Sequence, residues 1–368
     1  MSVEAVKRLI EHLDSKIVDD NPGQAFFSDE QYTSFPLSPE NFRDISTKTS
    51  NHALIFVDGG NQEILGAPNF SIQLNRVYFN VFKSNKRVKE IGIPCRVEFF
   101  SATYSIFRDN EIFYDTSIFP VRPEYSDFVP SESDLSFRST DRTVTVGTLR
   151  ADIERVASIA RRFAEWELAC HVVPNLERGD VIVMDGTLQT NFTNESKYLR
   201  KLAKTAYDRG VILTGLSKTS ALFTDTGLSL IGAVRKIAED NNLSGRWFIP
   251  VAIAATNDHN AMIMIAKLHP MAERIFRYEI SGDQYNNLGE EEVVRLFADL
   301  TANACDISFA GYPYGLIDAD RFARVTNNEI EHYQAVLLSE MSKLGKWRKF
   351  ARHMKAVDAH QLLNLVMK

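Results

Sequence analysis

The pattern of apolar and polar positions divides the chain into a first part made of strands and a second part in which strands and helices alternate. β-Branched and aromatic residues dominate stretches that short polar turns separate, which predicts adjacent strands over residues 53–58, 70–82 and 95–107. Later spacing predicts helices over 148–172 and 195–208, and strands over 181–185, 211–216, 248–254 and 262–268. This order is typical of an α/β fold, with a mixed sheet and flanking helices.

The remaining segments are expected to surround this sheet. Residues 1–25 have the pattern of an amphipathic helix, and irregular structure is expected from there to residue 50. The Pro-, Ser- and Asp-rich passage at 120–142 is expected to be a mobile loop excursion beside a functional face. We therefore divide the chain into an arm (1–50), a central domain (51–330) and a C-terminal helical segment that packs on it (331–368).

Composition and charge narrow the class of protein. The chain has 368 residues, of which 44% are hydrophobic and 24% charged, as in ordinary globular proteins. It has no signal-peptide pattern and no uninterrupted apolar stretch of about 18 residues, so we expect a protein that is neither exported nor membrane-bound. The three cysteines are far apart, which favours a reducing cytoplasm over a disulfide framework. The net charge of −6 argues against coating of nucleic acid by bulk charge, but it allows a local basic surface.

Two apolar segments each end in an Asp-Gly pair. ALIFVDGG contains Asp58 and DVIVMDGT contains Asp185. If both segments are neighbouring parallel strands, their last residues meet at one edge of the sheet, and the two carboxylates converge there. Asp-Gly is also ordinary turn chemistry. Because the pair occurs twice, each time after an apolar strand, we favour a functional interpretation.

The helix between these segments supplies a further carboxylate. Glu167 continues the apolar stripe that runs through Ile153 and Phe163, so it is expected to face the sheet. A buried carboxylate needs a cation, a hydrogen-bond donor or a metal ion as its partner. Glu165 falls on the polar face, where Arg161 at i−4 gives it a structural role, although drift at the helix end would exchange the two glutamates.

Such converging carboxylates suit hard divalent cations. Mg²⁺ and Mn²⁺ prefer oxygen ligands, and the histidine motifs typical of zinc enzymes are absent from the sequence. Two such ions, roughly 4 Å apart, can activate water and stabilise the leaving oxygen in phosphodiester cleavage. The pattern therefore predicts a hydrolytic metal centre built on Asp58, Asp185 and Glu167.

Several blocks between residues 50 and 330 together resemble the NurA nuclease family. They are VDGGNQEILGAPNFSIQLNRV, GDVIVMDGTL, GLSKTS, HPMAERIFRYE and GYPYGLIDADRFARV, in this order. The resemblance implies an RNase H-like fold and a Mn²⁺-dependent DNA nuclease, with Mg²⁺ as the alternative ion. It also implies 5′→3′ exonuclease and single-strand endonuclease activity in DNA end resection and double-strand break repair. A homodimer working with a HerA-type hexameric translocase is implied as well.

The same resemblance assigns roles to individual residues. Asp58 and Asp185 match the aspartates of the family's DG blocks, and Glu167, with Glu165 close behind, matches the glutamate of the intervening helix. Lys218 in GLSKTS matches a lysine near the scissile phosphate, where a cation would stabilise developing negative charge. A solvated turn lysine is the plainer explanation of Lys218 when it is taken alone.

Two features match the NurA family less clearly: the residue that completes the site, and the DGG sequence of the first block. Asp318 or Asp320 in LIDADRFA, or His360 in VDAHQLLN, can complete the site, and we select Asp320 and His360. The family's first block often reads DGS, whereas this chain has DGG, so it cannot make any interaction that depends on the serine hydroxyl. We interpret the glycines as allowing phosphate to approach the backbone.

Basic residues near the C-terminus are a candidate track for DNA phosphates. The segment SKLGKWRKFARHMK interleaves lysines and arginines with Trp347 and Phe350, although a solvated helix face would have the same pattern. Further DNA contacts are expected from the RIFRYE block, where a strand-edge role is an equal alternative. The expected DNA-binding residues are Arg274, Arg277, Lys346, Arg348, Lys349 and Arg352.

Two other classes of function remain as alternatives. Sugar-kinase and actin-like ATPases also carry an Asp-x-Gly after a first strand, but they need a second glycine-rich phosphate loop, and DGTLQT has a single glycine. A catalytically weak adaptor on a helicase ring is the other alternative. The presence of both Asp58 and Asp185 counts against the adaptor.

Overall fold

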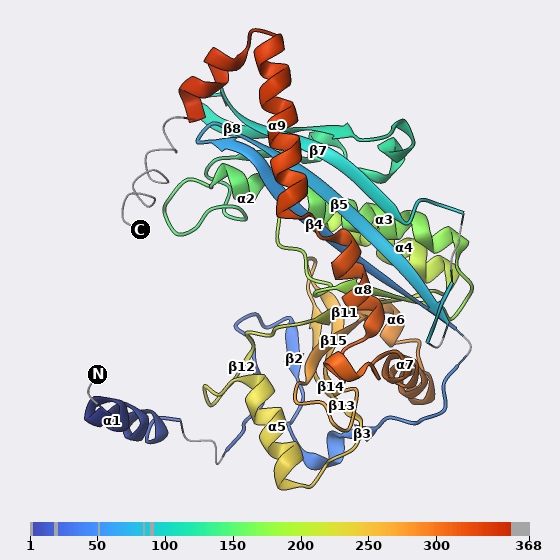
Figure 1. Ribbon diagram of the computed structural model, residues 1–368. Coiled ribbons are helices and arrows are strands. Elements are labelled where there is room, and N and C mark those ends of the chain that lie inside the picture. The colour runs from blue at the N-terminus through green and yellow to red at the C-terminus, as the bar shows by residue number, and fades with distance from the viewer. Residues whose placement is uncertain (1–2, 18–20, 51, 84, 89–91, 355–368) are drawn as a thin grey trace.

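A twisted 13-stranded mixed sheet forms the framework of the protein (Figure 1). The structure is a computed structural model that describes residues 3–17, 21–50, 52–83, 85–88 and 92–354. The strand order is β2-β13-β14-β15-β11-β10-β4-β5-β7-β8-β9, with β3 paired to β13 and β6 paired to β5. A separate two-stranded sheet joins β1 to β12. The predicted class, a mixed sheet with flanking helices, is confirmed.

The strands are β1 (Ala25–Phe26), β2 (Tyr32–Ser34), β3 (Arg43–Asp44), β4 (Ala53–Ala67), β5 (Phe70–Lys83), β6 (Lys86–Val88), β7 (Arg96–Arg108), β8 (Glu111–Pro120), β9 (Ser136–Arg138), β10 (Val181–Asp185), β11 (Ile212–Ser217), β12 (Phe223–Thr224), β13 (Trp247–Ala255), β14 (Asn260–Lys267) and β15 (Phe276–Ser281). The α-helices are α1 (Val3–Asp14), α2 (Ile153–Ala157), α3 (Ile159–Val172), α4 (Glu195–Arg209), α5 (Leu230–Asp240), α6 (Gly282–Tyr285), α7 (Glu290–Asn303), α8 (Tyr314–Ala323) and α9 (Asn327–Lys343).

The centre of the sheet is parallel, as the apolar runs predict. β10 pairs in parallel with β4 on one side and with β11 on the other. The remaining pairings in the sheet are antiparallel, as in the long β4–β5 hairpin. Because Met184 lies opposite Val57, the residues that follow them, Asp185 and Asp58, are neighbours across the two strands.

Helices cover both faces of this centre and bury alternate residues of each strand (Figure 1). Ile55 and Val57 of β4 pack in the core beneath α3 and α4. Leu54 and Phe56 pack in a second core beneath α7 and α8. α9 continues along the β4–β5 hairpin and covers a small apolar cluster there. The period-two alternation of β4 thus separates two cores, one on each face of the sheet.

Several segments differ from the sequence-based expectations. β4 does not end at Asp58 but continues to Ala67, because β5 remains paired to it along this length. The predicted helix over 148–172 begins at Ile153 and breaks at Ser158 into α2 and α3. The predictions also lacked α5 and α7, two amphipathic helices.

The passage at 120–142 is not the loop excursion that was predicted. It contains two 3₁₀ helices (Pro123–Phe128 and Glu132–Asp134) and strand β9, which pairs with β8. Its Tyr125, Phe128 and Phe137 are buried in the core beneath α3. The aromatic residues between its prolines and serines explain this, since their burial stabilises the segment against the sheet.

Near both ends of the described ranges the chain is helical, with α1 on the N-terminal side and α9 on the C-terminal side. α1 is shorter than expected, exposes every described residue and stands apart from the sheet (Figure 1). The rest of the arm joins the sheet through β2 and β3, which pair with β13. None of the helices within the described ranges is both long and apolar enough to cross a membrane.

Candidate functional site

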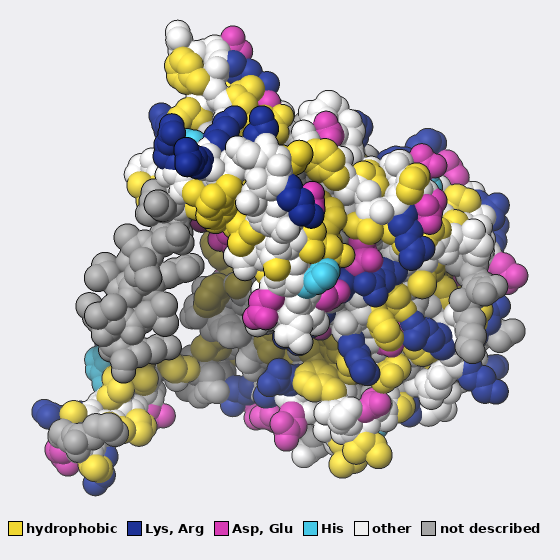
Figure 2. Space-filling view, turned by 45° about the horizontal axis from the view of Figure 1, so that its top comes forward, with side chains coloured by type: hydrophobic (Ala, Val, Ile, Leu, Met, Phe, Trp, Pro, Cys, Tyr) yellow, Lys and Arg dark blue, Asp and Glu magenta, His cyan; other side chains and the backbone are white. Residues whose placement is uncertain are grey.

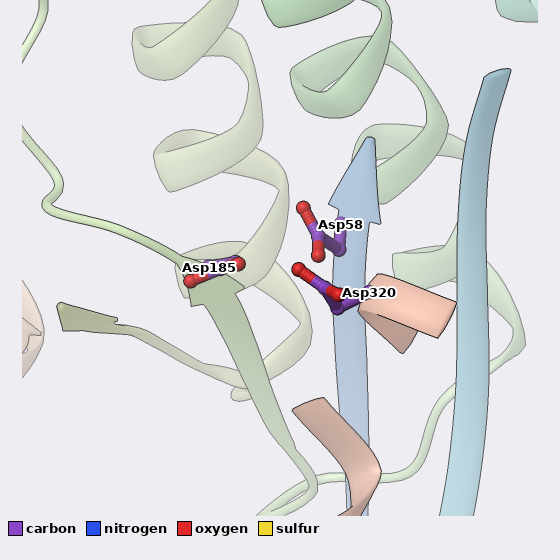
Figure 3. A group of neighbouring side chains, drawn as sticks. All are labelled: Asp58, Asp185 and Asp320. Atoms are coloured by element: carbon purple, nitrogen blue, oxygen red, sulfur yellow. The ribbon is translucent and has the colours of Figure 1, made fainter. Parts of the chain in front are cut away.

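Asp58, Asp185 and Asp320 converge at the edge of the sheet where β10 ends (Figure 3). Each offers a carboxylate oxygen, and these oxygens lie within 4.8 Å of one another. Asp58 comes from the middle of β4, Asp185 is the last residue of β10, and Asp320 comes from α8. The convergence of Asp58 and Asp185 follows from the parallel pairing that the apolar runs predict.

Lys218 lies among these carboxylates. It follows β11 directly, and its ammonium group donates to Asp185 Oδ2 at 2.7 Å and to Asp320 Oδ1 at 2.9 Å. The exposed fractions of the carboxylate side chains rise from 15% for Asp185 to 57% for Asp320. The site is therefore closed at Asp58, which is buried, and open to solvent at Asp320.

One lysine does not neutralise this cluster, and Asp58 shows the consequence. Burial, together with the negative charges of Asp185 and Glu165, raises the pKa of the Asp58 carboxyl to about 9. Burial alone would lower the pKa of Lys218, but the adjacent Asp185 and Asp320 raise it above its usual value. Without a further cation, Asp58 therefore holds a proton at neutral pH.

The expectation that Glu167, rather than Glu165, faces the aspartates is wrong. Glu167 points toward α4, where its carboxylate accepts from Lys201 Nζ at 2.5 Å and lies 3.4 Å from His171 Nε2. Glu165 is the glutamate near the aspartates, since its charge acts on Asp58 and its carboxylate lies against Gly59. Glu165 also forms ion pairs with Arg161 and Arg162.

The glycines after Asp58 have a structural reason that differs from the predicted one. A Cβ atom on Gly59 would lie 2.6 Å from Glu165 Oε1, so the glycine allows α3 to approach β4. A Cβ atom on Gly60 would lie 2.5 Å from the carbonyl oxygen of Ala323, at the end of α8. The two glycines therefore allow α3 and α8 to pack closely against β4.

Tyr312 is a candidate site residue that the sequence analysis did not select. It is 3% exposed, and its hydroxyl has no hydrogen-bond partner among the described residues. Burial raises its pKa, and the negative charges of Asp185, Asp58 and Asp320 raise it further. A weak signal was present, because Tyr312 precedes the same helix that carries Asp320 in GYPYGLIDAD.

The other predicted residues that the structure describes are not members of this carboxylate cluster. Asp318 points to the β5 side, where it accepts from Asn80 Nδ2 at 2.8 Å and pairs with Arg87. Arg277 is buried, with Nη2 placed 2.5 Å from Glu279 Oε1, so it is not a surface residue available to DNA. Arg274 is exposed beside the Phe309 ring. His360 lies outside the described residues.

The basic segment after α9 is exposed. Lys and Arg side chains gather there on the surface (Figure 2); they are Lys346, Arg348, Lys349 and Arg352. Phe350 is not available for base stacking, because it packs edge-on against Phe70 at 5.6 Å between ring centroids. Trp347 keeps 39% of its surface exposed.

Comparison with solved structures finds a related fold. The protein is similar to a crystal structure of NurA, with a TM-score of 0.50 and 8% sequence identity over 92% of this chain and 98% of that chain. A structure of Argonaute from Aquifex aeolicus matches over 76% of this chain and 29% of that chain, with 12% identity and a TM-score of 0.29. This TM-score is too low to carry an argument. No protein-family model and no curated protein matches the sequence. The resemblance to NurA is thus confirmed in the fold.

The donor set fits a hard divalent cation. All three converging side chains are carboxylates, which suit Mg²⁺ or Mn²⁺ better than softer metals. The excess negative charge and the proton on Asp58 mark a place where a cation would lower the free energy of the folded state. Such an arrangement can bind an ion, orient a water molecule and, through Lys218, contact a phosphate oxygen.

Proposed function

We propose that the protein is a metal-dependent DNA nuclease that hydrolyses phosphodiester bonds. The observation that carries this proposal is the convergence of Asp58, Asp185 and Asp320 around Lys218 at one edge of the sheet. The NurA-like fold adds support, because the structure with that fold spans almost the whole of this chain. We infer Mn²⁺ as the ion, with Mg²⁺ as the alternative, in a two-ion site.

Each residue of the site has a proposed role. Asp58, Asp185 and Asp320 would hold the cations, which supply a polarised water molecule and stabilise the leaving oxygen. Glu165 replaces Glu167 as the helix glutamate nearest this site. Lys218 would stabilise negative charge on the scissile phosphate. The buried hydroxyl of Tyr312 has no hydrogen-bond partner among the described residues, and it lies near enough to the aspartates for their charges to raise its pKa.

The wider setting of the activity is also proposed. We infer 5′→3′ exonuclease and single-strand endonuclease action in end resection during double-strand break repair. We also propose a homodimer that works with a HerA-type hexameric translocase, which the resemblance of the sequence blocks supports. Cys95, Cys170 and Cys305 are free thiols, which supports action in a reducing cytoplasm.

Digestion of end-labelled DNA tests the proposal. Purified protein is incubated with single- and double-stranded DNA, labelled at either end, in Mn²⁺, Mg²⁺ or EDTA. We expect ion-dependent degradation whose products reveal the polarity. Asp58→Asn and Asp320→Asn should each abolish degradation, because each removes an anionic ligand.

Asp318→Asn is the matched control for Asp320→Asn. Both aspartates lie on α8, two residues apart in sequence, but Asp318 points to Asn80 and away from the site. The control should retain activity, provided that circular dichroism shows it to be folded. Intact DNA in every ion, with a hexameric translocase present, would contradict the catalytic function and leave the adaptor alternative.

A further inference from the structure

A buried ionic cluster lies beneath the loop that follows Asp185. Glu279 and His259 are each 1% exposed, and His259 Nε2 lies 3.0 Å from Glu279 Oε2. Arg277 Nη2 lies 2.5 Å from the other carboxylate oxygen, Glu279 Oε1. The interactions with Arg277 and His259 outweigh the effect of burial, so the pKa of Glu279 is held below its usual value.

Glu279 binds the loop itself. Leu188, three residues after Asp185, donates its backbone N–H to Glu279 Oε2 at 2.7 Å. The loop has further backbone contacts with the turn that carries His259, since Gln189 forms a β-bridge with His259 and Thr190 N donates to the carbonyl of Asp258 at 2.8 Å. The segment 186–190 is thus held by β15 and by the β13–β14 turn.

The cluster also reaches the N-terminal arm. The hydroxyl of Tyr32 lies 3.0 Å from His259 Nδ1, the ring nitrogen that does not face Glu279. Tyr32 lies on β2, opposite Ala254 of β13, and its ring stacks on Phe27 at 4.4 Å between centroids. A chain of contacts therefore runs from the arm through Tyr32, His259 and Glu279 to Leu188.

Stabilisation of the core does not explain why these buried polar contacts are present. Charges are costly to bury, and apolar residues of similar volume often stabilise a core equally or better. A buried acceptor that binds a backbone N–H of a loop does fix that loop, because breaking the bond leaves a buried carboxylate without one of its donors. Groups that orient a ligand in this way commonly control metal affinity.

We propose that Glu279, oriented by His259 and Tyr32, is a positioning residue that fixes the 186–190 loop and through it the carboxylate of Asp185. The expected effect of Glu279 on the cation site rests on the proposed function. The fixing of the loop itself is independent of any ion. It also gives the arm a role, because Tyr32 links β2 to the loop that follows a cation ligand.

Hydrogen–deuterium exchange of the full chain without cations tests whether Glu279 fixes the 186–190 loop. Glu279→Ala should speed exchange in peptides that cover 186–190, and Tyr32→Phe should do so to a smaller extent. Glu279→Gln keeps an acceptor for Leu188 N–H and should restore protection. Asp299→Asn is the matched control: Asp299 is also a buried carboxylate that accepts from a backbone N–H, that of Ser50 at 2.8 Å, but it lies on α7.

Mn²⁺ affinity, measured from the electron paramagnetic resonance signal of the free ion, tests whether Glu279 also positions the carboxylate of Asp185. Glu279→Ala should bind Mn²⁺ about tenfold more weakly than the wild type, with Glu279→Gln closer to the wild type and Asp299→Asn unchanged. If Glu279→Ala does not fold, Tyr32→Phe supplies both readouts, and Glu279→Gln remains the conservative comparison.

The outcomes separate this inference from the proposed function. Unchanged exchange at 186–190 in Glu279→Ala would overturn it, and so would faster exchange with full Mn²⁺ affinity. A wild type that binds neither Mn²⁺ nor Mg²⁺ would overturn the proposed function and the consequence for the cation site. In that case the exchange data alone would decide whether Glu279 fixes the loop.

Discussion

At the residue scale, the burial of Asp58 among other carboxylates has a cost in stability. Its carboxyl is buried beside other carboxylates, and its pKa of about 9 lies far above the unfolded value of 3.8. The folded state thus binds a proton that the unfolded state releases, so the free energy of unfolding falls as pH rises from about 4 to about 9. Strained, charged sites of this kind are commonly retained for function.

Asp58→Asn should therefore stabilise the cation-free protein at neutral pH. The substitution removes the carboxyl whose ionisation opposes folding, and we expect a gain of about 2 kcal/mol, or roughly 2–6 °C in Tm. Differential scanning calorimetry from about pH 5 to about pH 8 should show the gap between variant and wild type widening with pH. Mn²⁺ should raise the Tm of the wild type and not that of the variant. Parallel pH profiles for both proteins would contradict this account.

The two glutamates of α3 make a second pair of residues for comparison. Glu165 lies near Asp58, whereas Glu167 is paired with Lys201 on the far side of the helix. Glu165→Gln should lower the rate of DNA cleavage at saturating Mn²⁺ by roughly 10- to 100-fold. Glu167→Gln, the matched control, should change it little. Initial rates on one labelled substrate measure both, and a larger loss in Glu167→Gln would reverse the assignment.

At the element scale, the position of α8 depends on the small residues of β4. The space above Gly60 is filled by the backbone of Ala323, one turn beyond Asp320. A serine at position 60, as in the DGS form of this block, would require the end of α8 to shift. The DGG sequence is therefore suited to this particular docking of the helix.

Gly60→Ser should consequently destabilise the protein by about 1–3 kcal/mol, as overpacking typically does. Urea denaturation measures the change. Gly245→Ser is the matched control, since a Cβ atom there would meet nothing within 4 Å and the change should be nearly neutral. Equal stability of both variants would show that α8 moves aside freely.

Elements also decide what the sequence could predict. The apolar runs of β4 and β10 were enough to place Asp58 and Asp185 side by side, because a parallel register brings strand positions together. The same reasoning failed for Glu165 because α3 packs against both the sheet and α4. Its residues from Phe163 to Cys170 are all buried, so an apolar stripe no longer identifies the face toward the sheet.

At the scale of the whole molecule, the unpredicted contacts join distant parts of the chain. Tyr32 and His259 are 227 residues apart, and Leu188 and Glu279 are 91 apart. Local spacing carries no signal for such pairs, since the strand order of the sheet brings them together. For the same reason the sequence left Arg277 with two equal interpretations, a DNA contact or a structural role on a strand, and the structure places it on β15 in a buried ion pair.

The charge distribution of the whole molecule leads to a last prediction. The chain is acidic, so DNA affinity should depend on local basic surfaces such as the exposed segment after α9. Replacing Arg348, Lys349 and Arg352 by Gln should weaken binding of single-stranded DNA. For every phosphate that the variant no longer neutralises, the slope of log affinity against log salt should fall in magnitude by about 0.7.

Fluorescence anisotropy in EDTA, over a series of salt concentrations, measures this slope without cleavage. The matched control replaces Lys197, Lys204 and Arg209 on α4 by Gln; these residues are also exposed, and their replacement removes the same charge from another side of the molecule. If the segment is a phosphate track, its variant has a shallower slope and the α4 variant keeps the wild-type slope, because only cations that touch the DNA release counterions. Equal, small changes in both variants would mean that net charge alone acts, and that the DNA path lies elsewhere on the protein.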